Sequence, residues 1–289
     1  MPNSSVLIVS TKADTATDEV ANRLTMRNVP YYRLNTEDYP FNHTMSYYPV
    51  ERDTWLCCNG QFIKHPTSVW YRRVRTAPTP DGMDEGVATF CRQEARAAII
   101  GSIIGQPTRW MSHPTAIWQA EFKPYQLHLA ATLGFSVPRT VITNTPATVR
   151  TAFREFGGMI VKPTRTGYVQ TSGGEYAIYT SRVLEQHLAE VDNARWSPAI
   201  YQELIPKAYD VRVTIVGTRC FAALIDSQSD PAAVTDWRLT NNPALPHRTV
   251  TLPDGVVGKL HDLMEALRLT FVPNQRVATR SQGNERTEL

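Results

Sequence analysis

The sequence has few cysteines, and their spacing is not typical of a metal site or a disulfide framework. Its 289 residues include four cysteines, which form no CxxC pair, at Cys57, Cys58, Cys91 and Cys220. This pattern excludes a zinc ribbon and a disulfide-rich scaffold. It predicts reduced thiols in a cytoplasmic protein.

Long hydrophobic runs and blocks of like charge are also absent. The apolar run Val6–Val9 near the N-terminus is too short for a signal peptide or a membrane span. Lys and Arg total 30 against 27 for Asp and Glu, a net charge of +3. We therefore expect neither a membrane nor a nucleic-acid partner. The hydrophobic content of 42% supports a packed core.

The first part of the chain predicts an α/β domain. Val6–Ser10 reads as a strand, Ala13–Asn28 as a helix and Val29–Leu34 as a strand, which is a βαβ opening. Asn59-Gly60 is a hairpin-turn signal. A long helix is expected over 85–104, packed through residues at helical intervals: Val87, Phe90, Ala97, Ile100 and Ile104. In the first helix the corresponding apolar residues are Val20, Leu24 and Met26.

The second half predicts α+β structure in a separate domain. Strands are expected at 159–162 and 199–204, with a hairpin of 210–216 and 219–226 turning at Gly217-Thr218. We place domain boundaries to give an N-terminal domain at 1–114, a second domain at 115–271 and a polar tail at 272–289. The tail lacks periodicity and is expected to be disordered.

Two stretches of the second domain suit phosphate binding. Lys162 ends an apolar strand, where its ammonium could pair with a polyphosphate or simply snorkel to solvent. The following loop, Thr164–Gly174, offers backbone N–H groups and hydroxyls that could fold over phosphates. An ordinary mobile hairpin loop is the alternative interpretation.

Two further stretches suit a purine and a reacting phosphoryl group. Tyr201–Lys207 is a proline-broken strand exit whose backbone could bond a purine edge. In 210–217 polar and apolar residues alternate, so Asp210 and Arg212 share one strand face. If Arg212 and Arg238 converge, they could clamp a transferring phosphoryl group; a surface ion pair is the alternative.

The order of these motifs resembles the ATP-grasp superfamily, its RimK-like branch and especially the microviridin-type (graspetide) peptide macrocyclases. The resemblance runs from about Ser5 to Leu269 and includes Val69–Arg73. It implies an ATP-grasp fold with an N-terminal βαβ pre-ATP-grasp domain. The other motifs that carry it are Lys123, Gln126, Ala130, Gly134, Pro138–Thr140, Val161-Lys162, Gln202–Ile205, Asp210–Thr214 and Asp236–Arg238.

The resemblance also implies roles for individual residues. Lys123 and Lys162 would contact the nucleotide phosphates, and Asp210 would hold the ribose. Arg212 and Arg238 would be catalytic, stabilising charge beside the γ-phosphate and an acyl phosphate. Glu203 and Leu204 would form the adenine-binding hinge, and their neighbours Gln202 and Ile205 would also belong to the cofactor-binding residues.

The implied activity is an ATP-dependent ligation that closes rings in a peptide. A side-chain carboxylate of a ribosomally made precursor peptide would be activated as an acyl phosphate and joined to a hydroxyl or an amine. ATP and Mg²⁺ are the implied cofactors, and a homodimer is plausible for the family.

The sequence departs from this family near its end. The family continues into an Asp-bearing strand and a Glu-x-Asn strand that together hold two magnesium ions. In this chain Val272–Leu289 shows neither, and Glu285 and Glu288 are poor substitutes. We therefore expect a truncated chain that lacks the final metal-binding strands, and the metal ligands stay unknown.

Two alternatives follow from these observations. The first is a catalytically silent relative that binds nucleotide or precursor peptide without turnover. The second is a RimK-like ligase that adds amino acids to a protein C-terminus.

Overall fold

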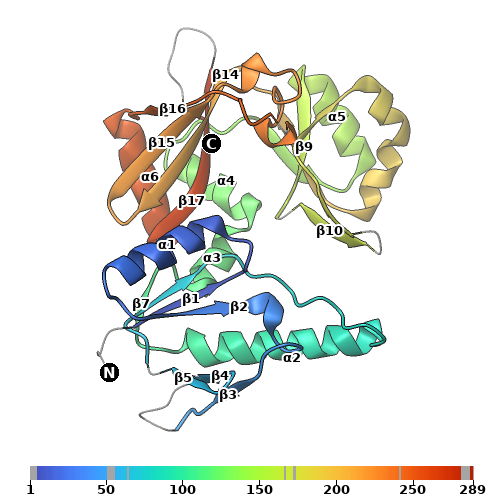
Figure 1. Ribbon diagram of the computed structural model, residues 1–289. Helices are drawn as coiled ribbons and strands as arrows, with labels where there is room; N and C mark the ends of the chain where they lie inside the picture. Colours follow the sequence, from blue (N-terminus) through green and yellow to red (C-terminus); the bar gives the residue numbers. More distant parts are fainter. Residues whose placement is uncertain are drawn as a thin grey trace. The chain divides into compact units, whose positions relative to one another are not determined.

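The computed structural model describes residues 5–50, 56–63, 65–165, 167–171, 174–240, 242–280 and 287–288. The chain divides into two compact units, Met1–Pro114 and Thr115–Leu289 (Figure 1). Each unit has its own sheets and core and is described by itself. No helix in the described ranges is long and apolar enough to span a bilayer.

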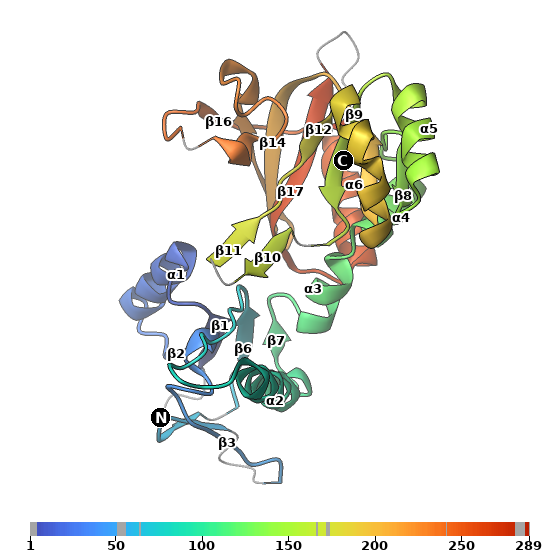
Figure 2. The same ribbon diagram turned by 90° about the vertical axis from the view of Figure 1, so that its right-hand side faces the viewer.

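The first unit contains a parallel four-stranded sheet in the order β2-β1-β6-β7. Its strands are β1 (Val6–Ser10), β2 (Tyr31–Asn35), β6 (Ser68–Tyr71) and β7 (Arg109–Trp110). Helices α1 (Thr15–Met26) and α2 (Glu85–Ile104) lie on opposite faces of this sheet (Figures 1 and 2). The chain passes from β1 to β2 on one side, and β6 pairs with the other side of β1. The strand order therefore reverses between β1 and β6, and such a switch point opens at the carboxyl ends of the strands.

Both predicted helices of this unit form, but the predicted packing faces are partly wrong. Met26 is 82% exposed, and Val87 and Phe90 are 53% and 63% exposed. The buried helix positions include small residues, among them Ala21 in α1 and Ala88 in α2. Small side chains let a helix approach a sheet closely. The strands supply the bulk of this core, including the fully buried Leu7, Ile8 and Val9.

A small antiparallel sheet completes the first unit. It comprises β3 (Met45–Tyr47), β4 (Leu56–Cys58) and β5 (Gln61–Ile63), in the order β3-β4-β5. Asn59 and Gly60 join β4 to β5 with φ angles of 48° and 75°. Two consecutive left-handed residues are typical of a type I′ turn, so the predicted Asn-Gly hairpin is confirmed.

The second unit holds an antiparallel sheet in the order β12-β9-β13-β8. Its strands are β8 (Thr140–Thr143), β9 (Met159–Pro163), β12 (Ser181–Val183) and β13 (Ala199–Glu203). Helix α5 (Pro146–Phe156) and the 3-10 helix η2 (Glu185–Trp196) pack against Met159 and Tyr201 on one face. Because side chains alternate along a strand, Lys162 and Gln202 project from the opposite face. The hairpin β10 (Tyr168–Thr171) and β11 (Gly174–Ala177) lies between β9 and β12 in the chain.

The other sheet of this unit has the order β16-β15-β14-β17-β18. Its strands are β14 (Lys207–Val216), β15 (Arg219–Ile225), β16 (His247–Val250), β17 (Phe271–Arg280) and β18 (Thr287–Glu288). After the short α3 (Pro114–Ala120), helices α4 (Lys123–Thr132) and α6 (Asp254–Ala266) share one core with Val211, Val213 and Ile215 of β14. The predicted alternation along β14 is confirmed, and it leaves Asp210 and Arg212 on the face away from that core.

The end of the chain differs from the expected disordered tail. Phe271–Arg280 forms β17 and pairs antiparallel with β14 along most of its length, from Val216 to Lys207. Glu288 lies in β18, which pairs with β17, whereas Glu285 lies outside the described residues. The expectation of a disordered tail is therefore wrong for 272–280, whereas the expected lack of an Asp-bearing strand is not contradicted, because β17 contains no Asp or Glu. Backbone pairing with β14 does not require an apolar pattern, which is why the sequence pattern missed this strand.

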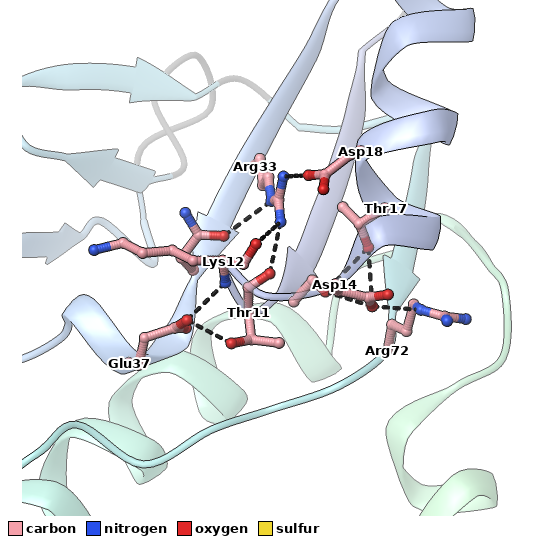
Figure 3. A network of polar contacts seen from close by, with 10 residues as sticks. Thr11, Lys12, Asp14, Thr17, Asp18, Arg33, Glu37 and Arg72 are labelled. Carbon is pink, nitrogen blue, oxygen red and sulfur yellow. Dashed lines mark hydrogen bonds and ion pairs between the residues drawn. The ribbon is translucent and has the colours of Figure 1, made fainter. Parts of the chain in front are cut away.

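A network of polar contacts organises the loop that follows β1 (Figure 3). Asp14 is 2% exposed as a side chain and accepts hydrogen bonds from Arg72 at 2.5 Å, Ser10 at 3.0 Å and Thr17 at 3.1 Å. Burial raises the pKa of Asp14, but the hydrogen bonds from Arg72, Ser10 and Thr17 outweigh burial, so its pKa lies below the ordinary value. Arg33 ties the same loop to α1 through Asp18 at 2.5 Å.

Asp14→Asn is expected to reduce the free energy of unfolding at pH 7 by about 3 kcal/mol, because it leaves the largely buried Arg72 without its partner. A carboxylate whose pKa is lower in the folded protein than in the unfolded chain stabilises the fold at pH values above its unfolded pKa of about 4. This stabilisation is lost as the pH falls through the folded pKa. The gap between the wild type and the variant should therefore be smaller at pH 3 than at pH 7, with most of the decrease below pH 4. Urea denaturation at both pH values measures it, with the exposed Asp81→Asn as control. An equal gap at both pH values would contradict the role of the Asp14 charge.

Candidate functional site

Lys162 is held by a hydrogen-bond chain that crosses three strands. Its Nζ donates to Oε1 of Gln202 at 2.9 Å, and Nε2 of Gln202 donates to Oγ1 of Thr140 at 2.7 Å. Thr140 donates its own hydroxyl hydrogen to the carbonyl of Pro138 at 2.7 Å. An ammonium can only donate, so the amide oxygen of Gln202 must face Lys162. Gln202 is 3% exposed and neutral, so this contact orients the Lys162 charge without neutralising it.

Hydrogen bonds hold the predicted adenine hinge in place through the side chain of Glu203 and the backbone of Leu204. Oε2 of Glu203 accepts from Nε of Arg139 at 3.0 Å, and Arg139 also donates to the carbonyls of Glu155 and Phe156 at the end of α5. The hydrogen bond to Glu203 raises the pKa of Arg139. The backbone N–H of Leu204 already donates to the carbonyl of Gly158 at 2.9 Å. Leu204 would therefore meet a purine through its side chain, and Ile205, which is partly buried, follows it.

Lys123 anchors the start of the loop after β9. Its Nζ donates to the carbonyls of Pro163 and Arg165, each at 2.6 Å, and its backbone N–H donates to Thr164 at 3.2 Å. These contacts give Lys123 an observed role in holding the loop, and its predicted phosphate contact stays a prediction. In the same loop, a Cβ on Gly167 would overlap the carbonyl oxygen of Ile178, so only glycine allows this close approach.

The two polar residues of β14 have different surroundings. Asp210 is 7% exposed and accepts from Nζ of Lys207 at 2.7 Å, while Lys207 also donates to the carbonyl of Thr235 at 3.3 Å. The guanidinium of Arg212 lies 6.0 Å from the ring centroid of Trp237, at the limit of a cation–π contact. Arg212 thus lies beside the residue that precedes Arg238. The ribose role of Asp210 remains a prediction.

Arg238 is held by a fully buried carboxylate. Both oxygens of Asp236, which is 0% exposed, accept from the Arg238 guanidinium, at 3.0 and 2.6 Å. The hydrogen bond to Asp236 is the main cause of the raised pKa of Arg238. The guanidinium also lies 5.3 Å from the ring centroid of Tyr179. A bidentate pair of this kind fixes both the position and the plane of the guanidinium.

Asp236 also connects the two sheets of the second unit. It accepts a hydrogen bond from the backbone N–H of Thr180 at 3.3 Å. Thr180 precedes Ser181, which pairs in register with Val161, the neighbour of Lys162. The loop that carries Arg238 is therefore docked beside the end of β9. The convergence of the side chains of Lys162, Arg212 and Arg238 on one phosphate site stays a prediction.

The described carboxylates of the second unit form no group that would hold a magnesium ion. Within the described parts of the chain, no three His, Cys, Asp or Glu residues are grouped closely enough to hold a metal ion. β17 occupies the place beside β14 without a single Asp or Glu in its sequence. The nearby carboxylates of Glu203, Asp210 and Asp236 are each paired with a cation. A cation already matches each of these charges, so they are poor ligands for a second one.

Several residues that organise the site were not among the predicted site residues. Arg139 orients the hinge, Lys207 pairs with Asp210, and Asp236 orients Arg238. Arg139 and Asp236 lie inside the motifs that carry the resemblance, so the sequence could have identified them as site residues. Lys207 had no such signal, because its contact with Asp210, three residues further along the same strand, depends on the irregularity of β14 between Lys207 and Tyr209.

The two sheets of the second unit, each covered by helices on one face and carrying these polar groups on the other, define an ATP-grasp fold. Residues 5–117 match the family described as the MvdD pre-ATP grasp domain. The chain thus has an ATP-grasp fold, and its N-terminal domain is similar to the MvdD pre-ATP grasp domain, which confirms the predicted fold class and resemblance. No curated protein is similar enough to count as a match.

Solved structures of peptide-modifying ATP-grasp proteins are similar over nearly the whole chain. The macrocyclase MdnC from Microcystis aeruginosa MRC, bound with precursor peptide MdnA, is 25% identical with a TM-score of 0.84, covering 98% of this chain and 89% of that chain. A Chryseobacterium gregarium RiPP-associated ATP-grasp ligase, in complex with ADP and a leader and core peptide, is 22% identical with a TM-score of 0.84, covering 99% and 87%. The macrocyclase MdnB from Microcystis aeruginosa MRC is 24% identical with a TM-score of 0.78, covering 99% and 90%.

Asp236→Asn is expected to reduce the free energy of unfolding by about 1–3 kcal/mol, because a buried charge-assisted pair and a backbone acceptor are weakened together. The same change at Asp192, an exposed residue whose contact with Arg195 is 4.0 Å long, should cost less than about 0.5 kcal/mol. Urea denaturation of the two variants makes the comparison. Equal stability of both would show that Asp236 does not hold the two sheets together.

Proposed function

We propose that the chain is an ATP-dependent ligase that joins a side-chain carboxylate of a ribosomally made precursor peptide to a hydroxyl or an amine of the same peptide. The observation that carries this proposal is the docking of the Asp236–Arg238 turn on Thr180, beside the Lys162 end of β9. In the proposal, this docking brings Lys162, Arg212 and Arg238 into one region. Such a region suits a triphosphate and the charge that develops during phosphoryl transfer.

The residues would divide between binding and charge stabilisation. Lys162, oriented by the neutral Gln202, would bind phosphate oxygens, and the hinge at 202–205 would receive the adenine. Lys123 would keep the loop after β9 in place, and Asp210 would accept from the ribose. Arg238, fixed in its plane by Asp236, and Arg212 would face the transferring phosphoryl group. ATP supplies the phosphoryl group that activates the carboxylate.

The proposed reaction balances as two substitutions. A carboxylate oxygen of the peptide bonds to the γ-phosphorus while the bond to ADP breaks, which gives an acyl phosphate. A hydroxyl or amine of the peptide then attacks the acyl carbon, loses a proton, and expels phosphate. The peptide loses the elements of one water for each ester or amide formed.

The similar structures support this substrate class. They are of macrocyclases and ligases, several crystallised with precursor peptides and, for PsnB, with magnesium and ADP or with AMPPNP. We extend the peptide partner and the use of ATP to this chain as part of the proposal. A homodimer remains a prediction.

A second candidate function is favoured by one specific observation. β17 carries no carboxylate, which is consistent with a relative that binds nucleotide or precursor peptide without turnover. A ligase that adds free amino acids to a protein C-terminus is the third possibility.

The proposal is tested by incubating the purified chain with ATP, magnesium and a candidate acidic precursor peptide encoded beside its gene. Mass spectrometry of the peptide and an assay for ADP are the measurements. We expect the peptide to lose the mass of a water molecule for each ring, together with ADP release. Nucleotide binding without a mass change selects the silent relative. A mass gain equal to an added amino acid selects the third possibility.

Arg212→Ala is expected to lower peptide-dependent ADP formation by at least about 100-fold while changing nucleotide affinity little, because it acts on developing charge. Arg238→Ala should lower it at least as much, and it is compared only if thermal melting shows a folded protein, because it also leaves the buried Asp236 without its partner. Arg150→Ala, at an exposed position of α5, is the control. Wild-type turnover in both arginine variants would contradict the catalytic assignment.

Lys162→Met is expected to weaken ADP binding by about 10-fold or more, because it removes an oriented ammonium while keeping most of the length of the side chain. Lys259→Met removes an ammonium on α6, outside the proposed site, and should leave the affinity unchanged. Isothermal titration with ADP measures both. Equal affinities would place the phosphates away from β9.

A further inference from the structure

The first unit contains a cavity of about 230 Å³ at the carboxyl edge of its parallel sheet. Val9 of β1 and Thr36, which follows β2, contribute to its lining, as does the segment 74–77, which follows β6. Helix α2 supplies a further wall with residues between Thr89 and Ile100. Ligands of open α/β sheets bind at this edge, where the strand order reverses. The cavity therefore lies where the topology of this unit favours a ligand.

The floor of the cavity is apolar and is built partly from small residues. The buried residues of this floor are Val9, Ala77, Ala95 and Ile99. The small side chains of Ala77 and Ala95 leave space that larger residues would fill. Thr76 and Gln93 also line the cavity but are exposed, so they mark its mouth. An apolar group that enters would make the van der Waals contacts that the unfilled floor lacks.

Polar groups around the cavity are already used in contacts within the protein. The hydroxyl of Thr36 donates to the carbonyl of Arg75 at 2.9 Å and accepts from its backbone N–H at 2.9 Å. Arg92 pairs with Glu85 at 2.5 Å, and Arg75 and Arg96 are likewise engaged in interactions within the protein. A charged ligand would have to compete with these contacts, whereas an apolar group would mainly displace water.

The volume of the cavity indicates the size of the group that fits. An apolar cavity of about 150 Å³ is large enough to bind benzene, and drug-sized ligands occupy about 300–1,000 Å³. A cavity between these limits suits one aromatic ring system and excludes a nucleotide. Aromatic rings also bury a large apolar area while few of their torsions are lost on binding.

We propose that this cavity binds an aromatic side chain of the substrate peptide, with the ring on the floor made by Val9, Ala77, Ala95 and Ile99 and the peptide backbone at the mouth. The choice of a peptide as the source of the ring rests on the proposed function. All the lining residues belong to the first unit, so binding is measured without nucleotide. A ring held there anchors the peptide without being modified.

The first experiment is a titration of the full chain, without ATP, with N-acetyl-tryptophanamide, N-acetyl-phenylalaninamide and N-acetyl-alaninamide, followed by saturation-transfer NMR. We expect each aromatic amide to bind at least about tenfold more tightly than the alanine derivative, because the floor removes the ring from water. Equal affinities of the three amides would overturn the proposal.

A cavity-filling variant places the binding at this site. Ala95→Leu, with folding checked by thermal melting, should weaken both aromatic amides by about tenfold, because the added side chain occupies the space of the ring. Ala98→Leu makes the same change at an exposed position of α2 outside the lining and should leave the affinities intact. If Ala95→Leu does not fold, Ala77→Leu fills the same floor from another wall. Unchanged affinity in the folded floor variant would overturn the proposal.

Competition distinguishes a peptide side chain from a free aromatic molecule. N-acetyl-tryptophanamide should displace the candidate precursor peptide, and a precursor whose aromatic residues are replaced by alanine should bind more weakly and escape the competition. A precursor that lacks aromatic residues, or that the amide does not displace, would overturn the assignment of the ring to the peptide. ADP formation is measured separately, so a failure of ligation leaves the binding result intact, and a failure of binding leaves the ligase proposal standing.

Discussion

The buried carboxylate of Asp236 is the interaction on which the arrangement of the second unit depends. It lies at 0% exposure, holds both sides of the Arg238 guanidinium and accepts the backbone N–H of Thr180. A buried carboxylate is stable only if it is paired and hydrogen-bonded, so these contacts are a physical requirement. Meeting that requirement brings the loop between β15 and β16 against the start of β12.

The charges around this arrangement are distributed unevenly. Glu203, Asp210 and Asp236 are each matched by a cation, from Arg139, Lys207 and Arg238 respectively. Lys162 is instead oriented by the neutral Gln202, which in turn is fixed by Thr140. A neutral acceptor holds an ammonium in place without matching its charge.

The strand β17 completes its sheet although it contains no carboxylate that could bind a metal ion. Its backbone pairs with β14, and one edge of β14 is thereby covered. Hydrogen-bond pairing uses only N–H and C=O groups, which every residue except proline supplies. Metal binding would need carboxylates at chosen positions of the strand, and β17 has none. In this part of the chain, a strand can therefore pair with β14 and complete the sheet without supplying ligands for a metal ion.

The sequence by itself determined the order of most strands and helices, the hairpin turns at Asn59-Gly60 and Gly217, and the polar face of β14 that carries Asp210 and Arg212. These features follow from local periodicity and from glycine or asparagine at left-handed positions. Only the tertiary structure decided which helix faces are buried, that 271–280 joins the sheet, and that Asp236 bonds to Thr180. Those outcomes depend on contacts between residues far apart in the chain, and no local pattern encodes such contacts.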